Sequence, residues 1–207
     1  MRERRIHAYC IQDTWQLHDY MLTIRGYTVF HHGMIAKPQR QRRTSAGVTI
    51  ILNPALTQAW ARAGKLKPII SSPPSKFPGR MIGVTLSFPK FLNRPTDNFE
   101  QKSKGSIKLF LCLIYHPYEF NEQREFYDEL DHFINTRPRN SEILMGADVN
   151  FNVGIIFKRL KDILGQHGLD NRNLKGRELL YLYKSNNFKI LLSFFAHTNY
   201  ITYRSFN

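Results

Sequence analysis

The feature that most constrains the fold is a series of strand-length apolar runs, several of which follow one another without a helical segment between them. Such runs lie at residues 5–12, 26–32, 47–52, 80–88, 107–115, 142–147, 189–195 and 200–204. The run at 47–52 is rich in β-branched residues, which is typical of a buried strand. The pattern favours an α/β (α+β) fold with two sheets packed together and helices outside, rather than a strictly alternating doubly wound sheet.

Helical patterns are fewer than strand patterns. The clearest covers residues 121–135, where Phe126, Leu130 and Phe133 recur at helical spacing among acidic residues. We also predict helices at 15–24 and 177–185, and a turn or two of helix within 56–63. The chain of 207 residues suits one domain with a sizeable core, so residues 1–207 are predicted to form a single domain.

The charge of the chain is high and unevenly distributed. Lys and Arg number 30 against 16 Asp and Glu, a net charge of +14, and residues 1–96 hold 15 basic but only three acidic residues. A one-sided positive field attracts polyanions, of which nucleic acid is the commonest. An anionic membrane surface or a solvated basic face are the alternatives. We predict DNA as the partner, bound by a basic loop that contains Lys37, Arg40, Arg42 and Arg43.

The two cysteines and the N-terminal residues bear on the compartment. Cys10 and Cys112 each lie in an apolar run, without metal-ligand or redox spacing, so we predict small buried hydrophobes in a reducing compartment. The basic N-terminus is not followed by the apolar segment of a signal peptide, and no run reaches membrane-spanning length. The prediction is a nuclear or cytoplasmic protein with no membrane partner.

The sharpest local motif is GADVN, residues 146–150, at the end of a predicted strand. Side chains two residues apart leave a strand on the same face, so Asp148 and Asn150 are expected to point together. The carboxylate can orient or deprotonate a water, and the amide can donate to a phosphate oxygen. The structural alternative is a turn, because Asp and Asn commonly cap turns after strands.

Two further motifs end predicted strands. In QDT, residues 12–14, Asp13 is a hard oxygen ligand suited to Mg²⁺ or Mn²⁺, but Asp13 with Gln16 also fits a capping box. In YHP, residues 115–117, the hydroxyl of Tyr115 can bond a phosphate, although an edge aromatic without chemistry is the plainer interpretation.

The order of these segments resembles the metal-dependent endonuclease/exonuclease/phosphatase family. The resemblance is carried by QDT, AGVTIIL, LIYHP, ILMGADVN, NLKG and ITYRS, and covers nearly the whole chain. It is closest to the apurinic-type endonuclease domains of non-LTR retrotransposons and their domesticated, craniofacial-development-like relatives. It implies a four-layer α/β sandwich of two packed mixed β-sheets with outer helices. The implied activity is hydrolysis of a DNA phosphodiester by a metal-activated water.

The resemblance assigns roles by motif position. Asp13 stands at the family's metal-binding glutamate, with Mg²⁺ or Mn²⁺ as cofactor. Tyr115 matches the tyrosine near the phosphate, Asp148 the aspartate that acts on the nucleophile or leaving group, and Asn150 its partner. Asn173 and Gly176 match structural positions at a helix start. The segment 201–205, with Arg204, matches a stretch near the DNA, with Tyr203 in place of tryptophan.

The chain also departs from the family pattern. The family's asparagine on a first strand would lie before residue 1, and its C-terminal Asp and Asp-His pair would lie beyond Asn207. None of the eight histidines is assigned the catalytic role. We therefore expect a domain shortened at both ends, with low or no turnover. The alternatives are a non-catalytic nucleic-acid-binding remnant and a phosphatase of the same superfamily.

Overall fold

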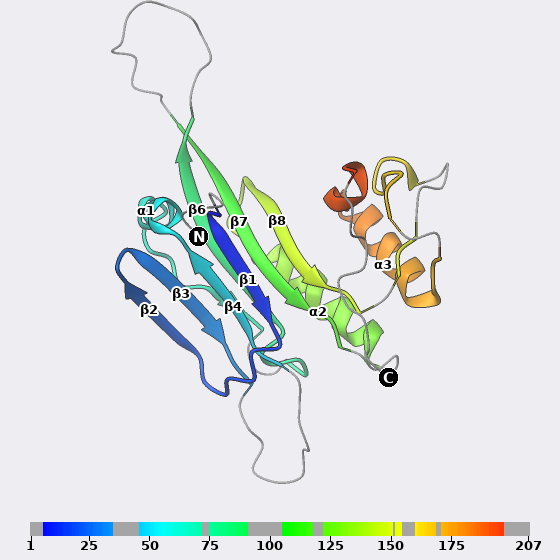
Figure 1. Ribbon diagram of the computed structural model, residues 1–207, viewed down its shortest axis with the longest axis horizontal. Helices are drawn as coiled ribbons and strands as arrows, with labels where there is room; N and C mark the ends of the chain where they lie inside the picture. The colour runs from blue at the N-terminus through cyan, green and yellow to red at the C-terminus, as the bar shows by residue number, and fades with distance from the viewer. Residues whose placement is uncertain are drawn as a thin grey trace, which may run out of the picture. The chain divides into compact units, whose positions relative to one another are not determined.

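The computed structural model describes residues 6–34, 46–71, 75–90, 105–117, 122–150, 152–154, 160–168 and 171–196. The chain divides into two compact units, Met1–Val149 and Asn150–Asn207. The described part of the first unit holds two four-stranded sheets and two helices, and that of the second includes the helix α3 (Leu174–Ser185) and the 3₁₀ turn η2 (Leu191–Phe194) (Figure 1). None of the helices in these ranges combines the length and the apolar character that a membrane span requires.

The first sheet, sheet A, is antiparallel. Its order is β1 (Ala8–Gln12), β4 (Val48–Leu52), β3 (Tyr27–His32) and β2 (Tyr20–Ile24). The predicted helix at 15–24 is therefore wrong. A two-residue turn at Arg25 and Gly26, both with positive φ (50° and 82°), joins β2 to β3. Such turns match the twist of paired strands, so pairing with β3 overrides the helical spacing.

The second sheet, sheet B, is mixed. Its order is β5 (Ile69–Ile70), β6 (Met81–Pro89), β7 (Ser106–Tyr115) and β8 (Ser141–Asp148). β6 and β7 are antiparallel, whereas β7 and β8 are parallel. The helix α2 (Gln123–Asn135) makes the crossover that a parallel pair requires. The predicted strands at 80–88, 107–115 and 142–147 and the predicted helix at 121–135 are thus confirmed to within three residues.

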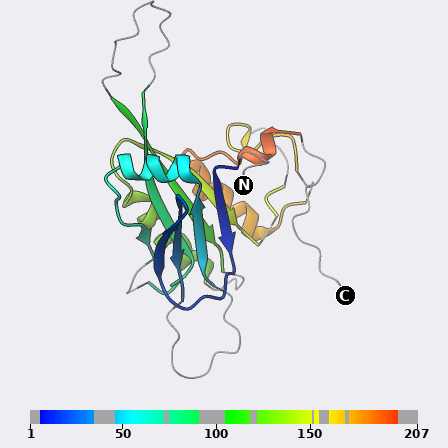
Figure 2. The same cartoon turned by 60° about the vertical axis from the view of Figure 1, so that its left-hand side comes forward.

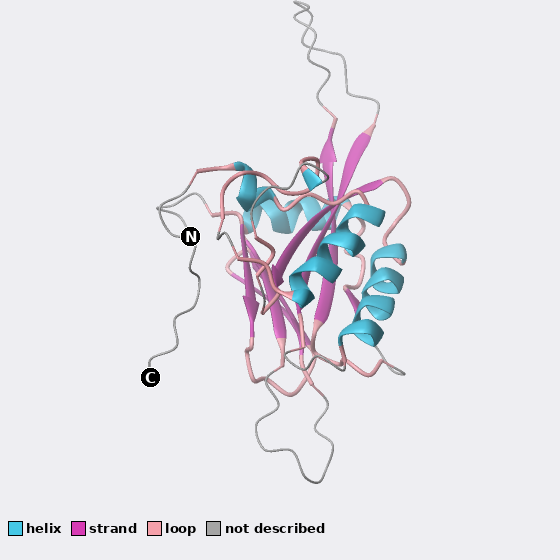
Figure 3. Cartoon of the chain, turned by 90° about the vertical axis from the view of Figure 1, so that its right-hand side faces the viewer, coloured by secondary structure: helices cyan, strands magenta, loops and turns pink. Residues whose placement is uncertain are grey.

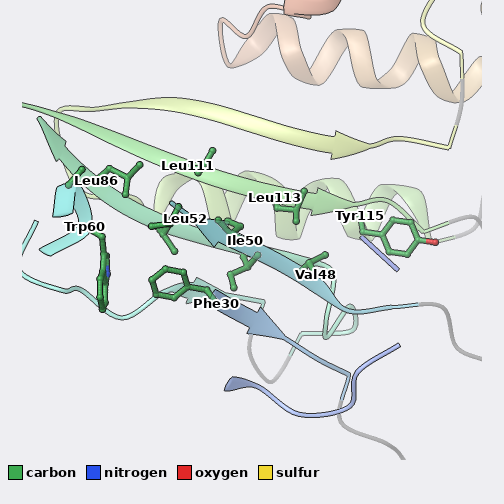
Figure 4. Packing of buried hydrophobic residues seen from close by; sticks show 12 residues of the cluster. Phe30, Val48, Ile50, Leu52, Trp60, Leu86, Leu111, Leu113 and Tyr115 are labelled. Atoms are coloured by element: carbon green, nitrogen blue, oxygen red, sulfur yellow. The ribbon is translucent and has the colours of Figure 1, made fainter. Parts of the chain in front are cut away.

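The core lies between the two sheets (Figure 4). Alternate residues of the central strands face one another across this layer, among them Ile50 of β4 and Leu113 of β7, both fully buried. Helix α1 (Pro54–Arg62) follows β4 and closes the core at one end (Figure 2). There Trp60 meets Phe30 edge to face, with 5.2 Å between the ring centroids. The strands of both sheets run between this end and a second end, where loops gather (Figure 3).

The residues of β7 that point away from this core are covered by α2. Phe110 is fully buried and lies 5.8 Å from Phe133 of the helix, measured between ring centroids. On the outer face of sheet A, Tyr9 and Ile11 remain 39% and 40% exposed. The first unit is therefore a mixed α/β fold with two packed sheets and a helix on the outer face of sheet B. The predicted burial is confirmed for Cys112, and Cys10 is half-buried; both thiols are free.

In the second unit, helix α3 (Leu174–Ser185) begins at a side-chain cap. Asn173 Oδ1 accepts the Gly176 amide at 2.9 Å, which confirms the structural role expected of both residues. The strand predicted at 189–195 is wrong, because Leu191–Phe194 forms a 3₁₀ turn, η2. The hydroxyl of Ser193 donates to the Ile190 carbonyl at 2.6 Å, which favours a turn over an extended segment. The strand predicted at 200–204 lies outside the described residues.

Candidate functional site

Tyr115 and Asp148 are neighbours at the ends of β7 and β8. They are direct register partners in the parallel pair, and each is the last residue of its strand. Partners in a parallel ladder project from the same face of the sheet, which here is the face that carries Leu113 into the core. The amide of His116 donates to the Asp148 carbonyl at 3.0 Å and ties the two strand ends together.

Asp13 follows β1 at the same end of the sandwich. The Gly47 amide donates to the Gly79 carbonyl at 2.9 Å, which joins the start of β4 to the start of β6. Since β1 is antiparallel to β4 and β7 is antiparallel to β6, β1 and β7 both end there (Figure 1). We call this the site end; it is the end at which β1, β3, β7 and β8 finish.

The backbone at Asp13 is not that of a helix cap. Residues 13–19 form a loop, in which Asp13 and Trp15 adopt left-handed φ values of 55° and 60°. The amides of Thr14 and Trp15 donate to the carbonyls of Gly47 and Ala46, at 3.2 and 3.1 Å, and hold the loop against the start of β4. The capping-box alternative is therefore wrong, because the chain runs on into β2 and no helix follows.

The side chain of Asp13 carries a buried oxygen with no partner. Its Oδ1 and the Thr14 hydroxyl are both buried without a hydrogen bond. A buried polar atom left unsatisfied costs roughly 1–3 kcal/mol, and a left-handed non-glycine residue costs about 1–3 kcal/mol more. Unsatisfied buried groups and strained residues cluster at binding sites, where a ligand can supply the missing hydrogen bond.

Arg80, which the sequence reasoning missed, occupies the same end. Its Nη1 donates to the carbonyls of Tyr115 and His116, at 3.3 and 3.2 Å, and its Cζ lies 5.0 Å from the centre of the Tyr115 ring. Burial lowers the pKa of Arg80, and Tyr115, Glu122 and Asp13 act in the opposite direction. A guanidinium stays charged over the physiological range. Arg80 therefore places a half-buried cation beside Tyr115 and within electrostatic range of Asp13.

His116 of the YHP motif does not add to this charge. Burial, together with the nearby charge of Arg80, lowers the pKa of His116 to about 3. The ring packs on Phe126, with 4.7 Å between centroids. At neutral pH the imidazole is uncharged, so it does not act there as a cationic phosphate ligand.

A second polar cluster at the site end surrounds two buried histidines. His31 Nδ1 lies 2.7 Å from the Thr49 hydroxyl, and the ring stacks on Tyr20 at 4.8 Å. His32 Nδ1 lies 2.8 Å from Asp19 Oδ1, and its Nε2 lies 3.1 Å from the Ser71 hydroxyl. In the sequence, two adjacent histidines directly before a glycine could have indicated a polar cluster. The sequence does not show which residues these histidines contact.

The other residues predicted for the site, Asn150 and the five DNA contacts, are not among the described residues that meet at the site end. Asn150 has a left-handed φ of 53°, and β8 ends at Asp148, so the strand alternation that would align their side chains does not extend to Asn150. Asn150 is the first residue of the second unit. Five predicted DNA contacts lie outside the described residues: Lys37, Arg40, Arg42, Arg43 and Arg204.

The described ranges contain no group of three or more His, Cys, Asp or Glu side chains arranged to hold a metal ion. Asp13 does fit as a single hard ligand, because its buried Oδ1 lacks a partner. Mg²⁺ commonly takes one or two carboxylates and keeps several waters. A cation held by Asp13 alone would keep most of its water ligands.

Comparison of the chain with protein-family models, with curated proteins and with solved structures found no match. The functional interpretation accordingly depends on the chain's own motifs and on the geometry of the site end.

Proposed function

We propose that the chain carries a metal-dependent phosphodiesterase site of the endonuclease/exonuclease/phosphatase type that acts on DNA. The observation that carries the proposal is the buried, unpartnered Oδ1 of Asp13 at the end where Tyr115 and Asp148 are register partners. The proposal includes the four-layer sandwich, of which two packed sheets and the helix over sheet B support three layers.

Each described side chain at the site end has a different role in the proposed reaction. A bound Mg²⁺ or Mn²⁺ would lower the pKa of a water and neutralise phosphate charge. Asp13 Oδ1 would hold the hydrated cation. Asp148 would orient the attacking water or take its proton, and the Tyr115 hydroxyl would donate to a phosphate oxygen. Arg80 would raise the positive potential beside that oxygen, from a position fixed by its bonds to two carbonyls.

The metal site is tested with Mn²⁺, a paramagnetic probe that broadens nearby amide signals. We expect broadening centred on Thr14, His116 and Val149, weak affinity, and its loss in Asp13→Asn. Asp128→Asn is the matched control, because it removes an exposed carboxylate from α2 rather than from the loop that carries Asp13. Broadening centred elsewhere, or unchanged in Asp13→Asn, would contradict the proposal.

Activity is tested by nicking of supercoiled plasmid with each metal, beside Asp148→Ala. We expect slow nicking, because the described residues supply one metal carboxylate and because His116 is neutral at the working pH. Loss of an acid–base group typically costs about 10²–10⁴ in rate. Fast nicking that Asp148→Ala abolishes would show that the catalytic set is more complete than proposed.

The net charge of +12 over residues 1–96 supports DNA rather than a small phosphate ester as the substrate. Contact with about four phosphates predicts a log–log salt slope near −3.6, or roughly a 10²-fold loss of affinity between 50 and 200 mM salt. Changing Lys37, Arg40, Arg42 and Arg43 to Ala should weaken binding similarly for all sequences. Binding without any metal-dependent cleavage would favour the alternative of a non-catalytic nucleic-acid-binding domain.

A further inference from the structure

Three segments that lead to the candidate site meet at one imidazole. His32 ends β3 and is 4% exposed. On one side its Nδ1 lies 2.8 Å from Asp19 Oδ1, at the end of the loop that starts with Asp13. On the other side its Nε2 lies 2.9 Å from the Gly79 amide, one residue before Arg80.

The two ring nitrogens meet different kinds of hydrogen-bonding groups. The Asp19 carboxylate accepts only, so Nδ1 carries the proton that is donated to it. The Gly79 N–H donates to Nε2, which also lies 3.0 Å from the Ser71 carbonyl oxygen, a group that only accepts. Both ring nitrogens are therefore engaged, Nδ1 by Asp19 and Nε2 by Gly79 and Ser71. Asp19 Oδ1 also accepts the Gly33 amide at 2.9 Å, so the carboxylate is held from two directions.

The turn at Gly79 is packed closely against the end of β3. Gly79 has a φ of 71°, and a Cβ at this position would come within 3.0 Å of the Gly33 carbonyl carbon and the Met34 nitrogen. The Gly79 carbonyl in turn accepts the Gly47 amide. A shift of this turn would therefore move Arg80 relative to the loop that carries Asp13.

The contacts Asp19–His32–Ser71 have the order found in serine hydrolases, but the geometry does not make Ser71 a nucleophile. Ser71 is only 7% exposed, and its hydroxyl donates to the Phe77 carbonyl at 2.9 Å. The lone pair of Nε2 already receives the Gly79 amide. The serine proton is thus directed away from the ring, and the cluster holds segments in place.

We infer that His32 is a positioning residue that couples the Asp13–Asp19 loop to the turn before Arg80, through separate hydrogen bonds from its two ring nitrogens. This inference concerns the same site as the proposed function, and its metal-binding consequence rests on that proposal. The coupling itself can be measured without metal or DNA.

Three substitutions separate the two bonds. His32→Asn places an amide where Nδ1 lies and can still donate to Asp19, but it leaves Gly79 without an acceptor. His32→Gln places an amide oxygen where Nε2 lies and can still accept from Gly79, but it releases Asp19. His32→Ala removes both bonds. His18→Ala, an exposed histidine of the same loop, is the control.

The readout is amide hydrogen exchange at Gly33 and Gly79 in the full chain. Loss of one buried hydrogen bond corresponds to about tenfold faster exchange. We expect His32→Asn to accelerate Gly79 alone, His32→Gln to accelerate Gly33 alone, and His32→Ala to accelerate both. Exchange within twofold of wild type in His32→Ala would overturn the inference, as would acceleration of both amides in every variant. If His32→Ala does not fold, the Asn and Gln variants decide the question.

Mn²⁺ binding then relates the coupling to the proposed site. We expect His32→Ala to weaken Mn²⁺ binding about tenfold, with the broadening still centred on Asp13. Unchanged affinity would contradict a positioning role for the metal ligand. If Mn²⁺ does not bind near Asp13 even in the wild type, the proposed function fails, while hydrogen exchange still decides whether His32 couples the two segments.

Discussion

The two ends of the sandwich are built from different kinds of interaction. At the α1 end, Asn53 caps the helix, Trp60 Nε1 donates to the Leu66 carbonyl at 2.9 Å, and Arg62 donates to the Ser87 carbonyl at 3.2 Å. At the site end, Asp13 Oδ1 and the Thr14 hydroxyl are buried without partners. The three buried histidines among the described residues also lie at that end.

The difference between the two ends suggests that the α1 end stabilises the fold, whereas the site end binds a ligand. Each polar group named at the α1 end is satisfied by a partner in the fold, so that end needs no ligand to explain it. The site end carries the buried unsatisfied oxygens of Asp13 and Thr14, which cost stability. Left-handed non-glycine residues occur at both ends, at Arg25 and Lys65 as well as at Asp13 and Trp15, so they do not distinguish the ends. Proteins depart from local rules mainly at functional sites, so this asymmetry points to the same end as the sequence motifs.

The largest expected effect is at the α1 end. Trp60→Ala should lower the free energy of unfolding by about 3–5 kcal/mol, because it empties a site packed against Phe30. Urea unfolding measures this change, and Trp60→Phe should cost less. Mn²⁺ broadening around Asp13 should persist in whatever fraction stays folded. If the folded fraction of Trp60→Ala lost the Mn²⁺ broadening, the α1 end would also be needed for metal binding, and the two ends would not have separate roles.

The next effect belongs to the site end and depends on pH. The pKa of His116 is about 3 in the folded protein, below its unfolded value, so the unfolded chain binds the extra proton as the pH falls below about 6.5. This group's contribution to stability is complete above that pH. It declines by about 1.4 kcal/mol per unit as the pH falls toward 3.

His116→Phe, which keeps an aromatic ring against Phe126, should flatten the decline of unfolding free energy between pH 6 and pH 4. His18→Ala serves as the control, since that side chain is exposed. Equal slopes in the wild type and His116→Phe would show that the ring is not held neutral.

A smaller effect is expected from the helix cap. Asn53→Ala removes the side chain that accepts the Leu56 amide at 3.0 Å, and should cost about 1 kcal/mol. Asn53→Asp retains the acceptor but loses the Nδ2 donor to the Ile6 carbonyl at 3.3 Å, so it should cost less than the change to Ala without being neutral. Thermal unfolding measures the stability of both variants. If Asn53→Asp is destabilised as much as Asn53→Ala, the lost helix cap does not explain the destabilisation.

The smallest change in stability is expected at Asp13. Asn tolerates left-handed φ and keeps the shape of the side chain, but Asp13→Asn removes a carboxylate oxygen that has no partner. We expect unfolding free energy between unchanged and about 1 kcal/mol higher, together with loss of Mn²⁺ broadening. A loss of 2 kcal/mol or more would show that the carboxylate serves the fold, and the two ends would then differ less than proposed.

Elements with strong local patterns could be predicted from the sequence. The β-branched run in β4, the apolar run in β7 and the amphipathic spacing of Phe126, Leu130 and Phe133 in α2 each follow from burial of one face or both. The segment 15–24 could not be predicted in this way. Its short helical spacing competes with pairing to β3, which is a long-range contact that no local pattern reveals.

The same division holds for the candidate site. The sequence by itself determined that Asp13, Tyr115 and Asp148 follow or end strands, because apolar runs stop at these residues. Only the tertiary structure decided that Tyr115 and Asp148 are register partners and that Arg80 and His32 join them. Arg80 belongs to no motif, and the HH pair does not show which residues His32 contacts. The roles of both come from carbonyls, a carboxylate and an amide far away in the chain. Strand register and loop packing bring such groups together, and both are set by burial of the whole core rather than by neighbouring residues.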